Sequence, residues 1–155
     1  MPASLFDTSV WLASLFPTHP LHAQARDHLQ QATAAAPAVF CRATQQSFLR
    51  LASTPALLKA YGATGMTNRD AVAALGALMA LPQVCERDEP AGCFAMWQQL
   101  AACDTASPKV WMDAYLAAFA ICGGLRLVSL DQDFGNFEAQ GLDLRLILPA
   151  QHANP

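Results

Sequence analysis

The chain has 155 residues, of which 54% are hydrophobic and 14% are charged. This length fits a single domain that needs no disulfide or metal to complete its core, and the net charge of −3 argues against binding of nucleic acid through overall positive charge. The high apolar content indicates that another subunit or a partner covers part of the surface.

The first half of the chain alternates short apolar strands with helices. Asp7-Thr8-Ser9 offers capping residues for the first helix, and prolines end it. In chain order the predicted elements are a strand over 3–6, a helix through 10–15, a helix over 22–31, a strand over 38–41, a helix over 44–52 and a helix over 71–81 with Asn68 as its cap.

The second half continues this alternation. Its clearest helix has Ser107 as N-cap, Pro108 as first residue and a stop at Gly123-Gly124. The other predicted elements are a strand over 83–86, a helix over 92–102, a strand over 125–130, a turn at 134–137 and a strand over 142–148.

Strands that alternate with helices predict an α/β fold with a mostly parallel central sheet of about five strands and helices on both faces. Residues 1–150 are expected to form one domain, and residues 151–155 a short C-terminal tail. The sequence contains no internal repeat and no linker.

The five cysteines form an odd set without a C-x-x-C pair. This disfavours both a disulfide framework and a zinc site, so we expect small buried side chains in a reducing compartment, with Cys122 in the core. Because no apolar run reaches the length of a membrane span and the N-terminus has no basic segment, we expect a cytoplasmic protein without a membrane partner.

Acidic residues occur in three apolar segments that are far apart in sequence: Asp7 in LFDTSVW, Asp113 in WMDAYLAAFA, and Asp131 and Asp133 in LVSLDQDF. In isolation each has an ordinary interpretation, as a helix cap, a solvated helix position or a polar turn. A parallel sheet, however, places ligands beyond the carboxyl ends of its strands. Carboxylates gathered there repel one another unless a divalent cation lies between them.

Three segments carry a resemblance to a known family: SLFDTSVWLA, FCRATQQSFLRLASTPAL and SPKVWMDAYLAAFAICGGLRLVSLDQDFGNFEAQGLDLRLI. In this order they span nearly the whole chain. They resemble the PIN-domain proteins and, more narrowly, the VapC-type ribonuclease toxins of bacterial type II toxin–antitoxin pairs.

The resemblance implies an endoribonuclease that depends on Mg²⁺ or Mn²⁺. Its catalytic and metal-binding residues are then Asp7, Asp113 and Asp131, with Asp133 as a further ligand. It also implies an RNA substrate, a VapB-like antitoxin that neutralises the enzyme, and a homodimer. The residues agree with this chemistry, because hard cations prefer carboxylate oxygens and water, and such ions activate water for phosphodiester hydrolysis.

One position departs from the family pattern. The Glu that members of this family carry early in the helix after the second strand falls on Gln45 here, with Gln46 as the competing register. A glutamine oxygen can hold a metal-bound water but carries no charge, so ion affinity is expected to be lower and Mn²⁺ to be favoured over Mg²⁺. The alternative interpretation is therefore a weakened or inactive PIN domain that binds RNA or its antitoxin without cutting.

Residues around the carboxylates complete the predicted site. We expect Gln45 and the hydroxyl side chains of Thr8, Ser9 and Ser129 to orient the carboxylates or the waters bound to the metal. Arg42 and Arg50, which flank the Gln45 segment, are the candidates for contacts with RNA phosphate or the antitoxin, with ordinary surface positions as the alternative.

Two other enzyme or signalling classes fit poorly. A phosphotransfer receiver needs two adjacent acids after its first strand and a lysine after its fifth, and the chain has neither. A phosphatase of the D-x-D type fails because Ser9 occupies the second aspartate position.

Overall fold

Five short strands form an all-parallel sheet in the order β3-β2-β1-β4-β5. The computed structural model describes residues 1–151, and the strands in it are β1 (Ser4–Phe6), β2 (Ala38–Phe40), β3 (Val84–Glu86), β4 (Arg126–Ser129) and β5 (Asp143–Leu146). From β1 the chain first builds outwards through β2 and β3, and it then returns to place β4 on the other side of β1. The topological switch point of the sheet therefore lies between β1 and β4.

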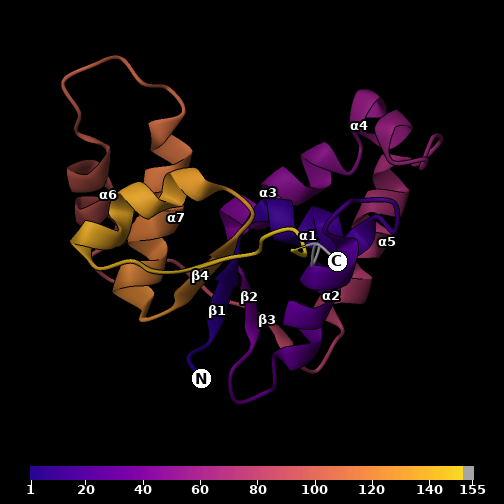
Figure 1. Cartoon of the computed structure of the whole chain (residues 1–155), viewed down its shortest axis with the longest axis horizontal. Coiled ribbons are helices and arrows are strands. Elements are labelled where there is room, and N and C mark those ends of the chain that lie inside the picture. Colours follow the sequence, from indigo (N-terminus) through magenta and orange to yellow (C-terminus); the bar gives the residue numbers. More distant parts are fainter. Residues whose placement is uncertain (152–155) are drawn as a thin grey trace.

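Helices cover both faces of this sheet (Figure 1). One layer contains α1 (Thr8–Leu15), α2 (His22–Gln31), α3 (Arg42–Leu51), α4 (Pro55–Ala60) and α5 (Asn68–Met79). The other contains α6 (Cys93–Ala101), α7 (Val110–Gly123) and the 3₁₀ segment η1 (Gln132–Gln140). These layers confirm the predicted fold class.

Alternation along the strands assigns side chains to the two layers. In β1, Phe6 packs among the helices of the α1–α5 layer, whereas Leu5 packs against the layer that contains α7. β4 repeats this division with Val128 and Leu127. The inner strands β1 and β2 are short and almost entirely apolar, as coverage of both faces requires, whereas the edge strand β5 alternates polar and apolar residues.

Trp11 connects the first helix to the sheet. Its side chain is fully buried and stacks on Phe40, with the ring centroids 3.7 Å apart, while Phe6 lies against it at 4.9 Å. Truncation of such an aromatic side chain to alanine costs about 3–5 kcal/mol. Trp11 thus fixes the start of α1, and with it the position of Asp7 directly after β1.

The elements agree closely with prediction along most of the chain. The helix predicted over 22–31 has those limits, and every predicted strand is present within two residues of its expected ends. Three details were wrong or missing. Thr67, not Asn68, caps α5 through a hydrogen bond from the backbone of Asp70. The turn predicted at 134–137 lies inside η1, and α4 was not predicted.

The start of α7 also differs from prediction. Its N-cap is Lys109, and Val110 is its first residue, although Ser107 and Pro108 form a favourable starting pair. The hydroxyl of Ser107 lies 3.2 Å from that of Thr105 and caps nothing. The carbonyl of Ser107 does accept a hydrogen bond from Val110, so the two residues form a turn before the helix.

The cysteines vary more in exposure than expected. Cys41 and Cys93 are buried, but Cys122 is only partly buried and Cys103 is exposed. All five are free thiols. In the part of the chain that the structure describes, no helix combines the length and apolar character needed to cross a bilayer. The predicted tail 151–155 lies almost entirely outside the described residues.

Candidate functional site

Asp7 lies at the switch point of the sheet. It follows β1, and its backbone N–H donates to Val128 of β4 at 2.9 Å, which extends the pairing of the two strands. Asp7 also occupies the N-cap position of α1, but its carboxylate makes no capping hydrogen bond. Asp7 therefore occupies the backbone position of a helix cap, but its carboxylate does not cap the helix.

Two serine hydroxyls hold the Asp7 carboxylate instead. Ser129, the last residue of β4, donates to Oδ2 of Asp7 at 2.8 Å, and Ser9 donates to the same oxygen at 2.9 Å. The Ser129 hydroxyl also accepts the backbone N–H of Asp131 at 3.0 Å. Since Ser129 is fully buried, it fixes Asp7 relative to the turn that carries Asp131.

Asp131 and Asp133 belong to the segment that follows β4. Asp131 is the N-cap of η1, and its Oδ1 accepts the backbone N–H of Asp133 at 2.9 Å. Both side chains are exposed. The cap leaves Oδ2 of Asp131 without a hydrogen-bond partner among the described residues, so this oxygen remains available to a ligand.

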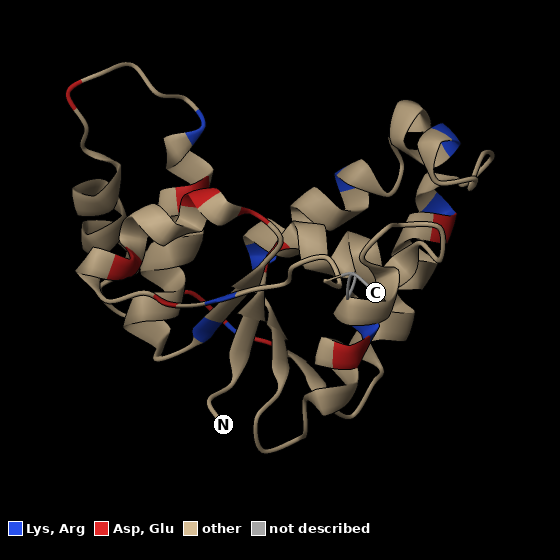
Figure 2. Ribbon diagram, viewed as in Figure 1, with Lys and Arg blue, Asp and Glu red and all other residues tan. Residues whose placement is uncertain are grey.

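Asp113 lies in the first turn of α7. Burial, and after it the negative charges of Asp131, Asp7 and Asp133 in that order, raise the pKa of Asp113 to about 6. Lys109 opposes this shift only weakly. The four aspartates predicted from the sequence are thus electrostatically coupled, and Figure 2 shows acidic positions where α7 and η1 meet beyond the sheet.

Asp7 responds to the same surroundings. Burial raises its pKa above the ordinary value, and the charge of Asp131 adds to this effect. The hydrogen bonds from Ser129, Ser9 and the backbone of Thr8 act in the opposite direction because they favour the ionised form. These hydrogen bonds therefore offset part of the effect of burial, although the pKa of Asp7 remains raised.

Within residues 1–151 none of these four aspartates forms an ion pair. The two ion pairs there are Arg42–Glu86 and Arg126–Asp143. Over the same residues no three His, Cys, Asp or Glu side chains are already close enough to enclose a metal ion. A divalent cation nevertheless fits the donor set, because it compensates the mutual repulsion and its ligand shell is completed by water.

Gln45 lies in a second polar group beside these carboxylates. It is buried, whereas Gln46 is exposed. Its Oε1 accepts a hydrogen bond from Nη1 of Arg42 at 2.7 Å, and its Nε2 lies 3.9 Å from the sulfur of Met79. The other terminal nitrogen of Arg42 pairs with Glu86 at 2.7 Å. No hydrogen bond of the described residues joins Gln45 to an aspartate.

The remaining predicted residues differ in their relation to the site. Thr8 contributes its backbone to Asp7, while its hydroxyl makes no hydrogen bond in the described part of the chain. Arg42 lies at the start of α3 and is 71% exposed. Arg50 lies in the last turn of the same helix and lines a separate hollow between α3 and α5. The structure thus separates the two arginines that the sequence grouped together.

Two features of the site were missed by sequence reasoning. Glu86 ends β3 and holds Arg42, a role that its place at the end of a strand could have indicated. An apolar hollow beside Asp113 is lined by aromatic and apolar side chains of three segments, including Trp97, Trp111 and Tyr115. Trp111 is 52% exposed.

The chain is similar in sequence to proteins of one known family. The sequence profile described as "PIN domain" matches residues 4–139. Ribonuclease VapC41 of Mycobacterium tuberculosis (strain CDC 1551 / Oshkosh) is 44% identical over 144 residues, which cover 92% of this chain and 97% of the relative. The protein of the same name from a second strain of that species matches equally well.

Solved structures share the fold at lower identity. VapBC2 of Rickettsia felis, crystallised with a fragment of its promoter DNA, matches with a TM-score of 0.61 and 13% identity over 93% of this chain and 98% of that one. VapC20 of Mycobacterium tuberculosis, described as a Sarcin-Ricin loop cleaving toxin, matches with a TM-score of 0.60 and 20% identity over 90% and 96%. At such identities these two likenesses concern the fold alone.

Proposed function

The chain belongs to the PIN-domain family, and from this premise we propose that it is an endoribonuclease that acts as the toxin of a VapBC-type toxin–antitoxin pair. The observation that carries the proposal is the coupling of Asp7, Asp113 and Asp131 at the switch point of the sheet, where none of the three forms an ion pair within residues 1–151. The 44% identity to a ribonuclease over nearly the whole chain supports the same activity.

Asp7, Asp113 and Asp131 are proposed to hold Mg²⁺ or Mn²⁺, with Asp133 as a further ligand. Such an ion, when bound, supplies an activated water and charge compensation at the scissile phosphate. The protein's part is to keep the ligands ionised and oriented. Ser129 and Ser9 do so for Asp7 by donating to one carboxylate oxygen, while the backbone of Asp133 does so for Asp131.

RNA is proposed to enter between α3 and α7, where basic and aromatic side chains border the carboxylates. Arg42 presents an exposed guanidinium held by Glu86, a geometry suited to a phosphate oxygen. Trp111 offers an exposed aromatic face beside Asp113, on which a base can stack. Arg50 is proposed to contact RNA only outside the catalytic centre, because it lies in the last turn of α3.

The proposed partners follow from family membership and from the surface. A VapB-like antitoxin is proposed to neutralise the enzyme, in line with the VapBC assembly of the structural neighbour. A homodimer is proposed because large apolar side chains remain exposed on several helices, among them Val72, Phe94 and Met112.

The second candidate function is an RNA- or antitoxin-binding PIN domain that does not cut. Gln45 favours it, because its oxygen is already occupied by Arg42 and adds no charge to the site. The two functions differ in whether the aspartates bind a divalent ion tightly enough to support hydrolysis.

Incubation of purified protein with bacterial total RNA and Mn²⁺, followed by mapping of new RNA ends, tests the proposal. The wild-type protein is expected to produce discrete new ends that EDTA abolishes and that Asp113→Asn lacks. Asp104→Asn is the matched control, because Asp104 is an exposed aspartate in the loop before α7.

Calorimetric titration with Mn²⁺ gives a readout independent of cleavage. Binding by the wild-type protein but not by Asp113→Asn supports a metal site. Tight Mn²⁺ binding without new RNA ends favours the non-cutting function, and absence of both contradicts the nuclease assignment.

A further inference from the structure

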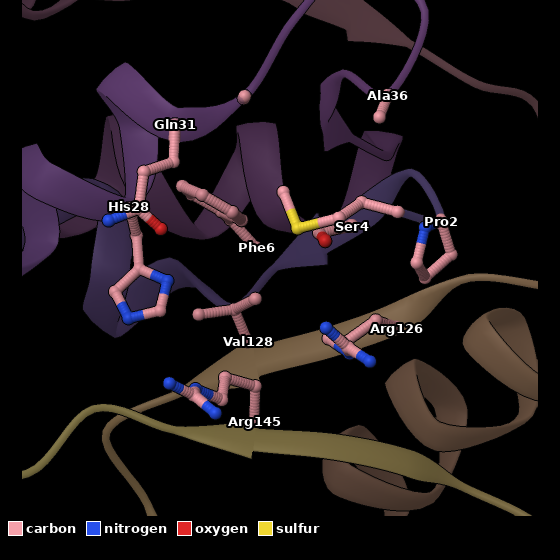
Figure 3. Close-up of a pocket in the computed structure, with 11 residues that line it drawn as sticks. Pro2, Ser4, Phe6, His28, Gln31, Ala36, Arg126, Val128 and Arg145 are labelled. Carbon is pink, nitrogen blue, oxygen red and sulfur yellow. The ribbon is translucent and has the colours of Figure 1, made fainter.

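A second polar hollow lies at the opposite edge of the sheet, near the amino ends of β1 and β4. Its volume is about 170 Å³, and it opens between α2 and the strands (Figure 3). Phe6 and Val128 line its apolar part, and His28, Arg126 and Arg145 contribute its basic side chains. We call it the basic hollow.

Strand register explains why two arginines lie together here. Arg126 pairs with Ser4 of β1, and Val128 pairs with Arg145 of β5. Paired residues of parallel strands project from the same face, so both arginines extend from the face that also carries Phe6. Such positions in a covered parallel sheet are ordinarily apolar. The two arginines therefore lie where α2 does not cover the sheet.

The donors that surround the basic hollow are largely unused. Nε of Arg126 donates to both carboxylate oxygens of Asp143 at 3.1 Å, which leaves its two terminal nitrogens free of protein partners within residues 1–151. In the same part of the chain Arg145 makes no ion pair. The side chains of Ser4, His28 and Gln31 also line the hollow without any hydrogen bond to described residues.

The positive charge of the basic hollow is balanced only in part. Asp143 pairs with Arg126 from outside the lining, whereas Arg145 makes no ion pair within residues 1–151, and the lining itself contains no Asp or Glu. Burial lowers the pKa of His28, and the positive charge of Arg145 lowers it further, while Asp27 acts in the opposite direction. Two of the nine Lys and Arg residues of this acidic protein therefore line the basic hollow.

We propose that the basic hollow binds a phosphate group, held by Arg126 and Arg145 on two adjacent strands with Gln31 and Ser4 as neutral donors. The donors come from α2, β1, β4 and β5, so they approach from several directions. A tetrahedral oxyanion accepts hydrogen bonds in all these directions, whereas a planar carboxylate does not. The volume also admits several waters, and hence one such anion.

This site is separate from the aspartates, which lie beyond the carboxyl ends of the same strands. Phosphate binding in the basic hollow therefore requires no divalent ion and does not depend on the proposed nuclease function. The phosphate group is either a free anion or the terminal phosphate of a nucleic acid fragment.

Titration of the intact protein with inorganic phosphate in EDTA, at constant ionic strength, tests the site. Binding is followed by thermal shift and by ³¹P line broadening. Arg145→Gln is expected to raise the Kd at least about tenfold, as loss of a charge-assisted hydrogen bond does.

Arg145 has an exposed side chain and no ion-pair partner among the described residues, so this variant should fold. Arg87→Gln, an exposed arginine after β3, is the matched control and should bind as the wild type does.

A parallel titration with a 5′-phosphorylated dinucleotide identifies the source of the phosphate. Tighter binding of the dinucleotide, lost in Arg145→Gln, assigns the basic hollow to a nucleic acid end, while equal affinities assign it to the free anion. If the wild-type protein binds neither probe, or if Arg145→Gln binds both as tightly as the wild type, the proposal is wrong.

Discussion

The carboxyl edge of the sheet has two halves with different charge. Beyond β1 and β4, Asp7 and Asp131 are electrostatically coupled to Asp113, and none of the three forms an ion pair within residues 1–151. Beyond β2 and β3, Gln45 and Glu86 both contact the guanidinium of Arg42, so charge is balanced within the group. We call these the acidic half and the balanced half.

This difference separates two tasks that a nuclease must perform. In the acidic half, burial and then the neighbouring negative charges raise the pKa values of Asp7 and Asp113, and a bound cation would oppose this shift. The balanced half has no such need, and its exposed Arg42 is free to meet a phosphate. We therefore expect changes in the acidic half to affect metal binding and changes in the balanced half to affect mainly RNA.

The largest effect is expected for Asp7→Asn. Loss of this ligand should lower the RNA cleavage rate by more than about a hundredfold, beyond the range usual for residues that only support a ligand. The metal-free variant should be at least as stable as the wild type, because a buried carboxylate that is repelled by Asp131 has been removed. Cleavage assays and urea denaturation in EDTA measure the two quantities. A variant that cleaves at the wild-type rate would remove Asp7 from the mechanism.

Ser129→Ala should have the next largest effect. Ser129 joins Asp7 to the turn of Asp131, so its loss should weaken Mn²⁺ binding about 10- to 100-fold, as is usual for a residue that orients a metal ligand. Ser14→Ala is the matched control, because Ser14 is equally buried but bonds only to the carbonyl of Val10 in its own helix. Calorimetric titration separates the two, and equal affinities in both variants would show that Ser129 is not needed to orient Asp7.

The acidic half could be predicted from sequence because strand order decides where its residues lie. Asp7 follows an apolar strand and Asp131 follows another, and a parallel sheet brings such positions to one edge. Asp113 required the family resemblance, since a helix position alone does not reveal which layer the helix joins. The two serines were named as supporting residues, but their shared acceptor, Oδ2 of Asp7, depends on side-chain rotamers that sequence does not encode.

The balanced half was predicted only in part. Gln45 could be chosen over Gln46 by alignment with the family, and its burial fits that choice. Its contact with Arg42 follows from helix geometry, because residues three apart share a face. Glu86 is distant in sequence, and only the β2–β3 pairing, which places Glu86 beside Phe40, brings it to Arg42. Such a contact depends on the register of the strands, which the sequence pattern leaves open by a residue or two.

Gln45→Glu is the sharpest test of the division between the halves. The new carboxylate should tighten Mn²⁺ binding about tenfold, equivalent to about 1.4 kcal/mol. Arg42 limits the gain, because it already contacts the oxygen at this position and would neutralise the added charge. The double variant with Arg42→Gln should therefore bind Mn²⁺ more tightly than Gln45→Glu alone, as calorimetry can establish. If both variants bind Mn²⁺ as the wild type does, position 45 lies outside the reach of the metal.

The smallest expected effect is on the pH dependence of stability. Because the pKa of Asp113 is raised to about 6 in the folded protein, between about pH 4 and 6 the folded state keeps a proton that the unfolded chain has lost. The stability of the metal-free protein should therefore fall as pH rises through this window. Asp113→Asn should reduce that slope without abolishing it, since the raised pKa of Asp7 acts with the same sign.

Glu86→Gln should leave the slope unchanged, because no aspartate of the acidic half owes its shift to Glu86. Urea denaturation in EDTA at several pH values measures these slopes, and a change in Glu86→Gln as large as that in Asp113→Asn would show that the two halves titrate as one site.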